Sequence, residues 1–354
     1  MVQQVVQQKV QQKVQQNHLV IHAGSHKTGS SAIQRYLFDH QSRLGATHYL
    51  NRGKPNASPW MLQAFKHDFA ALPAFRHRQL GAVKSTAMRE RARALLAEQS
   101  ARSTAPLCIL SAEAIGTFNG EELRALHDCV APFFTRVSLH QYFRPVTSRM
   151  ESAFQEKLKH GATTLKQKFP LAYIHTLELQ DSIFGAENVH SYKYDSGQFP
   201  EGDVVPHFLS QMGIEPVSDG AAADVNKGLS LPAIQLLYVY RMFYPSQAER
   251  DRRVVARLKP LSGKPLRFHS ELYHELIVLT PEEEVRFEER TGFSIAENVQ
   301  ADDDIAIRCE EDLLAIPEHS VAWLYAQSDS GRAMAKPDLQ GIASLVALLG
   351  VQTP

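Results

Sequence analysis

Short apolar runs alternate with helical patterns along residues 18–212 of this 354-residue chain. The runs predict strands at His18–Ala23, Thr47–Leu50, Leu107–Leu110, Arg136–Phe143 and Val189–Tyr194. The patterns between them predict helices at Ser30–Phe38, Ser85–Gln99, Gly120–Ala131, Thr147–Lys159, Leu171–Phe184 and Val204–Met212. Neighbouring parallel strands need a long crossover connection, and a helix usually supplies it. The alternation therefore predicts an α/β fold with a central parallel sheet flanked by helices.

The two ends of the chain read differently from this alternating region. Residues 1–17 begin with repeated Val, Gln and Lys, and we expect a low-complexity extension that is frayed or, at most, a marginal helix. After about residue 226 helical patterns dominate, including the charged segment ERDRRVVARLK from Glu249, which we expect to be a solvated helix face. We thus expect an α/β domain at 18–240 and a mainly helical C-terminal extension, packed on the same domain, at 241–354.

The overall charge of the chain disfavours one large class of function. Its 38 basic residues balance 38 acidic ones, whereas a dedicated nucleic-acid binder usually carries a basic excess. No apolar run approaches the roughly 20 residues of a transmembrane helix, and no apolar signal-peptide core is present, so we expect a cytoplasmic protein. Cys108, Cys129 and Cys309 are few and widely spaced, which predicts reduced thiols and no metal site.

The turn between the first strand and the first helix has an unusual composition. It reads Gly-Ser-His-Lys-Thr-Gly-Ser-Ser over residues 24–31. Such a turn directs backbone N–H groups and the positive end of a helix at one point, which favours phosphate or a similar anion. Lys27 would add a mobile positive charge. The ordinary nucleotide-binding loop has its lysine after the second glycine, whereas Lys27 precedes Gly29.

This turn resembles the 5′-phosphosulfate loop of PAPS-dependent sulfotransferases of the bacterial type, which reads approximately K-[ST]-G-[ST]-[ST]. PAPS is 3′-phosphoadenosine 5′-phosphosulfate. The stretch from Val137 to Gly161 is similar to the family's 3′-phosphate motif, with Arg144 at a strand end and Ser152 on the following helix. Weaker similarities extend the resemblance over roughly Leu19–Leu237. Pro145 is a departure, because it offers no N–H to a phosphate.

The resemblance implies a P-loop-like fold, PAPS as cosubstrate and no metal. The residues that would hold PAPS are Ser25, His26, Lys27, Thr28, Gly29, Ser30, Ser31, Arg144 and Ser152. Lys27 would neutralise the oxygen that leaves sulfur. Glu113, where the third predicted strand ends, is the first candidate for the base, and His26 is the second. We expect His22, inside the first strand, to pack and to hydrogen-bond a neighbour.

The sequence therefore predicts a sulfotransferase that modifies a hydroxyl or amine acceptor, with a carbohydrate or glycolipid suggested by family analogy. Two alternatives remain open: an ATP-dependent kinase or phosphotransferase, and a non-catalytic nucleotide-binding relative. Residues 51–78 and 159–168, with parts of the C-terminal third, are where we expect the acceptor to bind, because acceptor pockets are assembled from variable loops.

Overall fold

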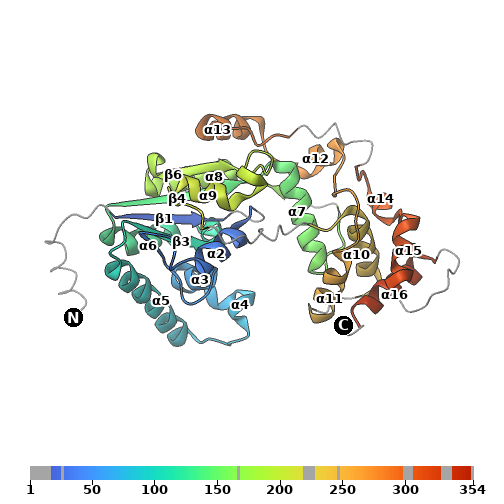
Figure 1. Cartoon of the computed structure of the whole chain (residues 1–354), viewed down its shortest axis with the longest axis horizontal. Helices are drawn as coiled ribbons and strands as arrows, with labels where there is room; N and C mark the ends of the chain where they lie inside the picture. Colours follow the sequence, from blue (N-terminus) through green and yellow to red (C-terminus); the bar gives the residue numbers. More distant parts are fainter. Residues whose placement is uncertain are drawn as a thin grey trace. The chain divides into compact units, whose positions relative to one another are not determined.

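The computed structural model describes residues 17–24, 28–165, 168–217, 228–244, 248–297, 306–327 and 337–351 (Figure 1). All but the last residue of the expected N-terminal extension lies outside these ranges. The chain forms two compact units, which we describe separately. The sheet unit contains Met1–Arg144, Ala172–Asp224 and Glu282–Ser294, and the helical unit contains Pro145–Leu171, Val225–Pro281 and Ile295–Pro354.

The sheet unit is built on five parallel strands. They are β1 (His18–Ala23), β2 (Thr47–Tyr49), β3 (Leu107–Ala112), β4 (Arg136–Phe143) and β6 (Val189–Lys193). Their order across the sheet is β2-β3-β1-β4-β6, so β1 is central and has β3 and β4 as its neighbours. This arrangement confirms the expected α/β class, and each predicted strand lies within two residues of an observed one.

Helices of the sheet unit follow the strands closely. They are α2 (Ser30–Asp39), α3 (Ser58–Phe65), α4 (Pro73–Arg76), α5 (Ala82–Arg102), α6 (Gly120–Val130), α8 (Tyr173–Phe184), α9 (Val204–Gln211) and most of α13 (Pro281–Thr291). Single 3₁₀ turns lie at η1 (Phe69–Ala71), η2 (Glu113–Thr117), η3 (Ala131–Phe133), η4 (Ala186–Asn188) and η5 (Pro200–Gly202). Helices α3 and α4 occupy part of the segment that we expected to be a variable loop.

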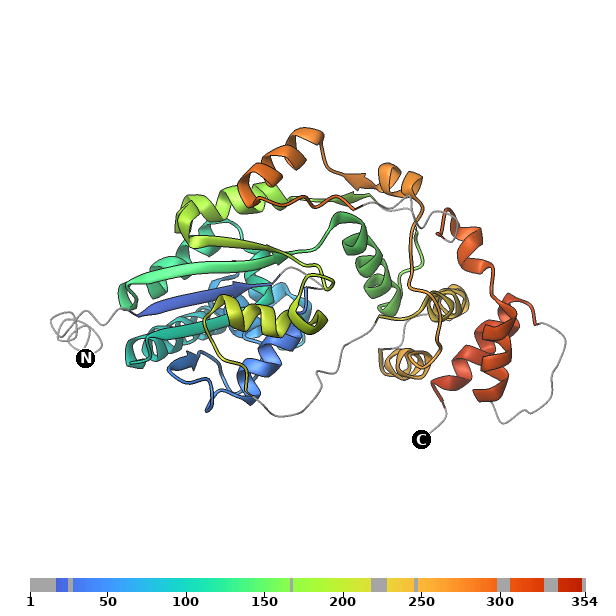
Figure 2. The ribbon, with the colours of Figure 1, turned by 45° about the horizontal axis from the view of Figure 1, so that its top comes forward.

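The helices cover both faces of the sheet (Figure 2). On one face, Ile33 of α2 and Phe208 of α9 share a buried cluster with Tyr142 of β4. Gln141, the residue before Tyr142, points to the opposite face, where its side-chain amide exchanges hydrogen bonds with Gln180 of α8. Burial on both faces explains why the strands read as nearly continuous apolar runs.

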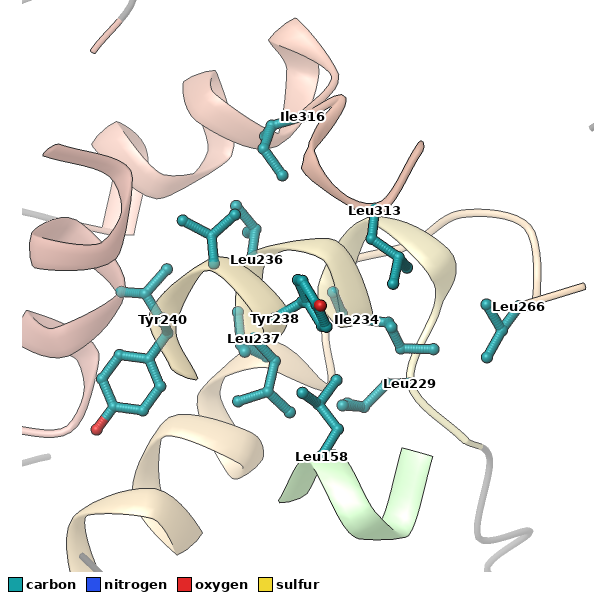
Figure 3. Packing of buried hydrophobic residues seen from close by; sticks show 14 of the residues in the cluster. Leu158, Leu229, Ile234, Leu236, Leu237, Tyr238, Tyr240, Leu266, Leu313 and Ile316 are labelled. Atoms are coloured by element: carbon teal, nitrogen blue, oxygen red, sulfur yellow. The ribbon is translucent and has the colours of Figure 1, made fainter. Parts of the chain in front are cut away.

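The helical unit packs around one helix that is buried on all sides. Its helices are α7 (Val146–Lys159), α10 (Leu231–Phe243), α11 (Ala248–Leu258), α12 (Ser270–Leu276), α14 (Glu310–Leu314), α15 (Glu318–Gln327) and α16 (Leu339–Leu349). Two short parallel strands, β5 (Phe169–Pro170) and β7 (Ile277–Val278), pair beside them. Ten successive residues of α10, from Pro232 to Arg241, are buried. Figure 3 shows Ile234, Leu237 and Tyr238 of α10 among apolar side chains of neighbouring elements.

The charged segment from Glu249 forms α11, as expected, but it is not solvated throughout. Arg252, Arg253 and Arg257 are exposed, whereas Asp251 is buried and forms an ion pair with Arg241 of α10, with 2.7 Å between Nη1 and Oδ1. A charge is accepted in such a core only when a partner charge compensates it. The segment is therefore an amphipathic helix whose buried side carries one paired charge, that of Asp251.

The observed division of the chain also differs from the boundary expected near residue 240. Helix α7 and the whole of α10 belong to the helical unit, because the apolar residues of both helices join its core. The chain also returns to the sheet unit at Glu282, far beyond that expected boundary.

Among the described residues, none of the helices is long and apolar enough to cross a bilayer.

Candidate functional site

The candidate site lies where β1, β3 and β4 end. Because the strands are parallel, the residues that follow them emerge at one edge of the sheet. Ala23, the last residue of β1, pairs with Ala112, the last residue of β3. The connection after β1 runs to β2 on one side of β1, and the connection after β3 crosses to β4 on the other side. Ligands of open α/β sheets bind at such a reversal of strand order.

Gly24 lies between two of the residues that the sequence singled out. A β-carbon on Gly24 would lie 2.4 Å from Oγ of Ser30 and 3.0 Å from Cγ of Glu113. From the other side, a β-carbon on Gly116 of η2 would lie 2.7 Å from the carbonyl oxygen of Gly24. The start of α2 and the turn after β3 therefore meet at this glycine. Any larger residue at position 24 would clash with the side chains of Ser30 and Glu113.

Gly29, at the N-cap of α2, fixes the entry into that helix. Its φ of 74° lies in the left-handed region, which a residue with a side chain adopts only at a cost. A β-carbon there would lie 2.4 Å from Cγ1 of Val204 and 3.5 Å from Cε2 of Tyr194. The carbonyl oxygen of Gly29 accepts hydrogen bonds from the N–H groups of Ala32 and Ile33. Close packing and backbone conformation both require glycine here.

The first turn of α2 presents groups suited to an anion. The N-cap residue is Gly29, which has no side chain, so this residue supplies no capping oxygen to compensate the positive end of the helix. Ser30 is buried, and its Oγ has no hydrogen-bond partner in the described part of the chain. Buried hydroxyls are normally hydrogen-bonded, and an exception in a native fold calls for an explanation such as a ligand. An anion at this helix end would bond to the hydroxyl.

Arg144 follows β4 at the same edge, and Tyr194 positions it. The guanidinium Cζ lies 5.2 Å from the centroid of the Tyr194 ring, which favours a cation–π contact. The Tyr194 N–H donates to the carbonyl oxygen of Phe143 (2.8 Å), and the Tyr173 hydroxyl donates to that of Arg144 (2.9 Å). Burial raises the pKa of Tyr194; Asp203 adds to the rise and Arg144 opposes it. Tyr194 therefore remains a neutral ring under the arginine.

The structure brings several of the predicted site residues into the sheet unit. Thr28 and Gly29 precede α2, Ser30 and Ser31 begin it, and Glu113 and Arg144 directly follow β3 and β4. Ser152 belongs to α7, in the helical unit. Ser25, His26 and Lys27 lie outside the described residues.

Sequence reasoning missed two residues beside this site. One is Tyr194, whose ring lies under Arg144 and would meet a β-carbon added to Gly29. The other is Ser58 of α3, whose Oγ accepts the N–H of Ala114 (3.0 Å) and so holds the segment after Glu113. Tyr194 could have been found, because it follows the last parallel strand at the ligand-binding edge. Ser58 had no such signal.

His22, in the strand that ends at the site, packs and hydrogen-bonds a neighbour, as expected. It is fully buried in β1, its Nδ1 and the Ser111 Oγ are 2.7 Å apart in a hydrogen bond, and its ring packs on Phe208. Burial lowers the pKa of His22 from 6.5 to about 4, so the ring is neutral at physiological pH. A neutral, engaged histidine stiffens the end of β1. The three cysteines, also as expected, are free thiols.

The fold and the site define an α/β protein with a strand–loop–helix junction at the carboxyl edge of its parallel sheet. No family model and no curated protein matches the chain. Among solved structures, a sulfotransferase from Alicyclobacillus acidocaldarius is similar in 63% of this chain and 93% of that one, with 14% sequence identity and a TM-score of 0.36.

Proposed function

We propose that this chain is a sulfotransferase that transfers the sulfuryl group of PAPS to a hydroxyl or amine of a carbohydrate or glycolipid. The proposal rests chiefly on the meeting of Ser30 and Glu113 at Gly24. This contact joins the N-terminus of α2, a buried hydroxyl without a partner among the described residues, and a carboxylate. The first two suit the anionic donor, and the third suits removal of a proton from the acceptor.

In this proposal the loop at residues 25–31 binds the 5′-phosphosulfate of PAPS, and Arg144 binds its 3′-phosphate. A guanidinium offers a planar fork of N–H donors that matches two phosphate oxygens. The stacked Tyr194 ring holds this fork, which reduces the side-chain freedom that binding would otherwise remove.

The proposed reaction is a direct displacement at sulfur. The acceptor oxygen or nitrogen forms a bond to sulfur while the bond between sulfur and the bridging phosphate oxygen breaks. Glu113 takes the acceptor's proton, with His26 as the second candidate. Lys27 neutralises the charge that develops on the phosphate oxygen of the departing 3′-phosphoadenosine 5′-phosphate (PAP).

Calorimetric titration with PAPS, PAP, ATP and GTP, each with and without Mg²⁺, tests the donor assignment. We expect PAP and PAPS to bind equally well with and without Mg²⁺, and more tightly than ATP or GTP. Selective, Mg²⁺-dependent binding of ATP would instead favour a kinase. Tight binding of PAP without transfer of labelled sulfate to any acceptor of a cell extract would favour a non-catalytic relative.

A further inference from the structure

A concave surface lies in the sheet unit, between α3 and α5. The pocket has a volume of about 280 Å³ and is lined by Arg52, Gln63, Arg91, Glu98 and an apolar part of α5. Arg52 follows β2, at the same edge of the sheet as the loop after β1. Helices α3 and α5, which form the walls, are labelled in Figure 1. We call this site the α3–α5 pocket.

The charges of the α3–α5 pocket are unbalanced. Within the part of the chain that the structure describes, the guanidinium groups of Arg52 and Arg91 form no hydrogen bond or ion pair with the protein. The one carboxylate of the pocket, Glu98, is 2.8 Å from Arg102 in an ion pair. Two like charges at one concave surface repel each other, and an anion between them would remove that repulsion.

Neighbouring contacts hold the walls of the pocket in place. Trp60 of α3 is 3% exposed, and its Nε1 donates to the carbonyl oxygen of Ala92 in α5 (2.9 Å). The Cζ of Arg52 lies 6.0 Å from the centroid of the Trp60 ring. The Gln63 side-chain amide donates to the carbonyl oxygen of Met88 (2.9 Å). The pocket is therefore formed before a ligand binds, which favours affinity.

Helix α3 also connects this pocket to the proposed base. Its first residue, Ser58, bonds to the segment after Glu113, and Gln63 lines the pocket five positions later. One helix thus contacts both the segment after Glu113 and the pocket.

We infer that the α3–α5 pocket binds a carboxylate or sulfate group of the acceptor, which makes the acceptor an acidic oligosaccharide or glycolipid. This inference rests on the proposed function for the identity of the acceptor. Arg52 and Arg91 each bond to the anion, and Glu98 accepts hydrogen bonds from sugar hydroxyls. Because both arginines are exposed, each contact is worth less than a buried one, and we expect a loss of about two- to fivefold in affinity per arginine.

Trigalacturonate, its methyl ester and neutral maltotriose are the probes, titrated by saturation-transfer NMR against the full chain. We expect trigalacturonate to bind about tenfold more tightly than the ester. Arg52→Ala and Arg91→Ala should each weaken the binding of trigalacturonate by the factor given above. The double variant should bind trigalacturonate and its methyl ester equally. Arg124→Ala, an exposed arginine of α6, is the matched control and should change nothing. Sulfated trisaccharide in a parallel titration separates a carboxylate site from a sulfate site.

Equal binding of acid and ester, or unchanged binding by the double variant, would overturn the inference. PAP titrated into the same samples separates this outcome from failure of the donor assignment. If PAP binds but neither trigalacturonate nor the sulfated trisaccharide shows arginine-dependent binding, the inference about the pocket is overturned and the donor assignment stands. Arginine-dependent binding of either probe without PAP binding supports the pocket and contradicts the sulfotransferase. If transfer occurs, the double variant should raise KM for the acidic acceptor and leave kcat unchanged, as loss of uniform binding predicts.

Discussion

The guanidinium of Arg144 lies over the ring of Tyr194, with 5.2 Å between Cζ and the ring centroid. The two residues follow neighbouring parallel strands, β4 and β6, and the backbone N–H of Tyr194 bonds to the residue before Arg144. The arginine is thereby fixed at the edge of the sheet where β1 and its loop also end. This geometry makes Arg144 the first residue to test.

Arg144→Ala should weaken the affinity for PAP by about ten- to a hundredfold, because a charge-assisted contact is worth roughly 1.5–3 kcal/mol. Ligands without a 3′-phosphate, such as adenosine 5′-phosphosulfate, should be nearly unaffected. Titration calorimetry with both ligands measures the difference, and Arg102→Ala, an exposed arginine of α5, is the control. Equal losses for the two ligands would mean that Arg144 has only a structural role.

Lys27→Ala should abolish transfer and leave the free energy of unfolding close to that of the wild type. The expected loss is kinetic, since the lysine acts on charge that develops as the sulfur–oxygen bond breaks. Transfer of labelled sulfate and urea unfolding are the two measurements, with Lys84→Ala on the exposed side of α5 as the control. Activity of the wild type should also survive EDTA. Full loss of activity on chelation, restored by Mg²⁺, would argue for the kinase alternative.

Glu113→Gln keeps the shape of the side chain and removes its basicity. Turnover should fall by about 10²–10⁴-fold, the usual contribution of a general base, while PAP affinity stays unchanged. Steady-state kinetics and PAP titration check this pair of outcomes. If the variant unfolds, Glu113 is a structural residue of the turn after β3 and His26 becomes the better candidate. Unchanged turnover would exclude Glu113 as the base.

Gly29→Ala should destabilise the sheet unit and impair PAP binding. The alanine would meet Val204 and would also occupy the left-handed region, which costs roughly 1–2 kcal/mol by itself. Gly45→Ala separates the two effects, because Gly45 has φ of 62° and a β-carbon added there would meet no atom within 4 Å. Urea unfolding should show a larger decrease in the free energy of unfolding for Gly29→Ala than for Gly45→Ala. Equal decreases would show that Val204 moves aside without an energetic penalty.

Acid should destabilise this protein through its buried histidines. The pKa of His18 falls from 6.5 to about 4, mainly by burial and also through the nearby Arg136 and His190. Between those pH values the unfolded chain binds more protons than the folded one, so stability falls as the pH drops from about 6.5 towards 4. His22 and His140, with pKa values lowered to about 4 and about 2, add to this trend.

Urea unfolding at about pH 7.5 and about pH 5 measures the acid effect. His18→Gln should reduce the loss of stability between the two pH values, because glutamine does not titrate. His77→Gln, at an exposed position, should leave the loss as in the wild type. A variant of His18 with the same pH dependence as the wild type would show that other groups control acid unfolding.

The sequence determined the class of fold and most of its elements. The strand Arg136–Phe143 was predicted with its observed bounds, and the helix that starts at Ser30 with its observed beginning, because both are encoded by local apolar patterns. Helix α3, where Trp60, Met61, Ala64 and Phe65 recur at helical spacing, was not assigned, since its aromatic and basic residues fitted an acceptor loop and a packed helix equally well.

Only the tertiary structure decided which residues meet. The order β2-β3-β1-β4-β6 places Glu113 beside Gly24 and Ser30, although these residues are far apart in the chain. The same order brings Tyr194 under Arg144, and helix packing sets the two guanidiniums of the α3–α5 pocket at one surface. Local patterns cannot encode such contacts, because each depends on strand order and on packing between segments that are distant in sequence.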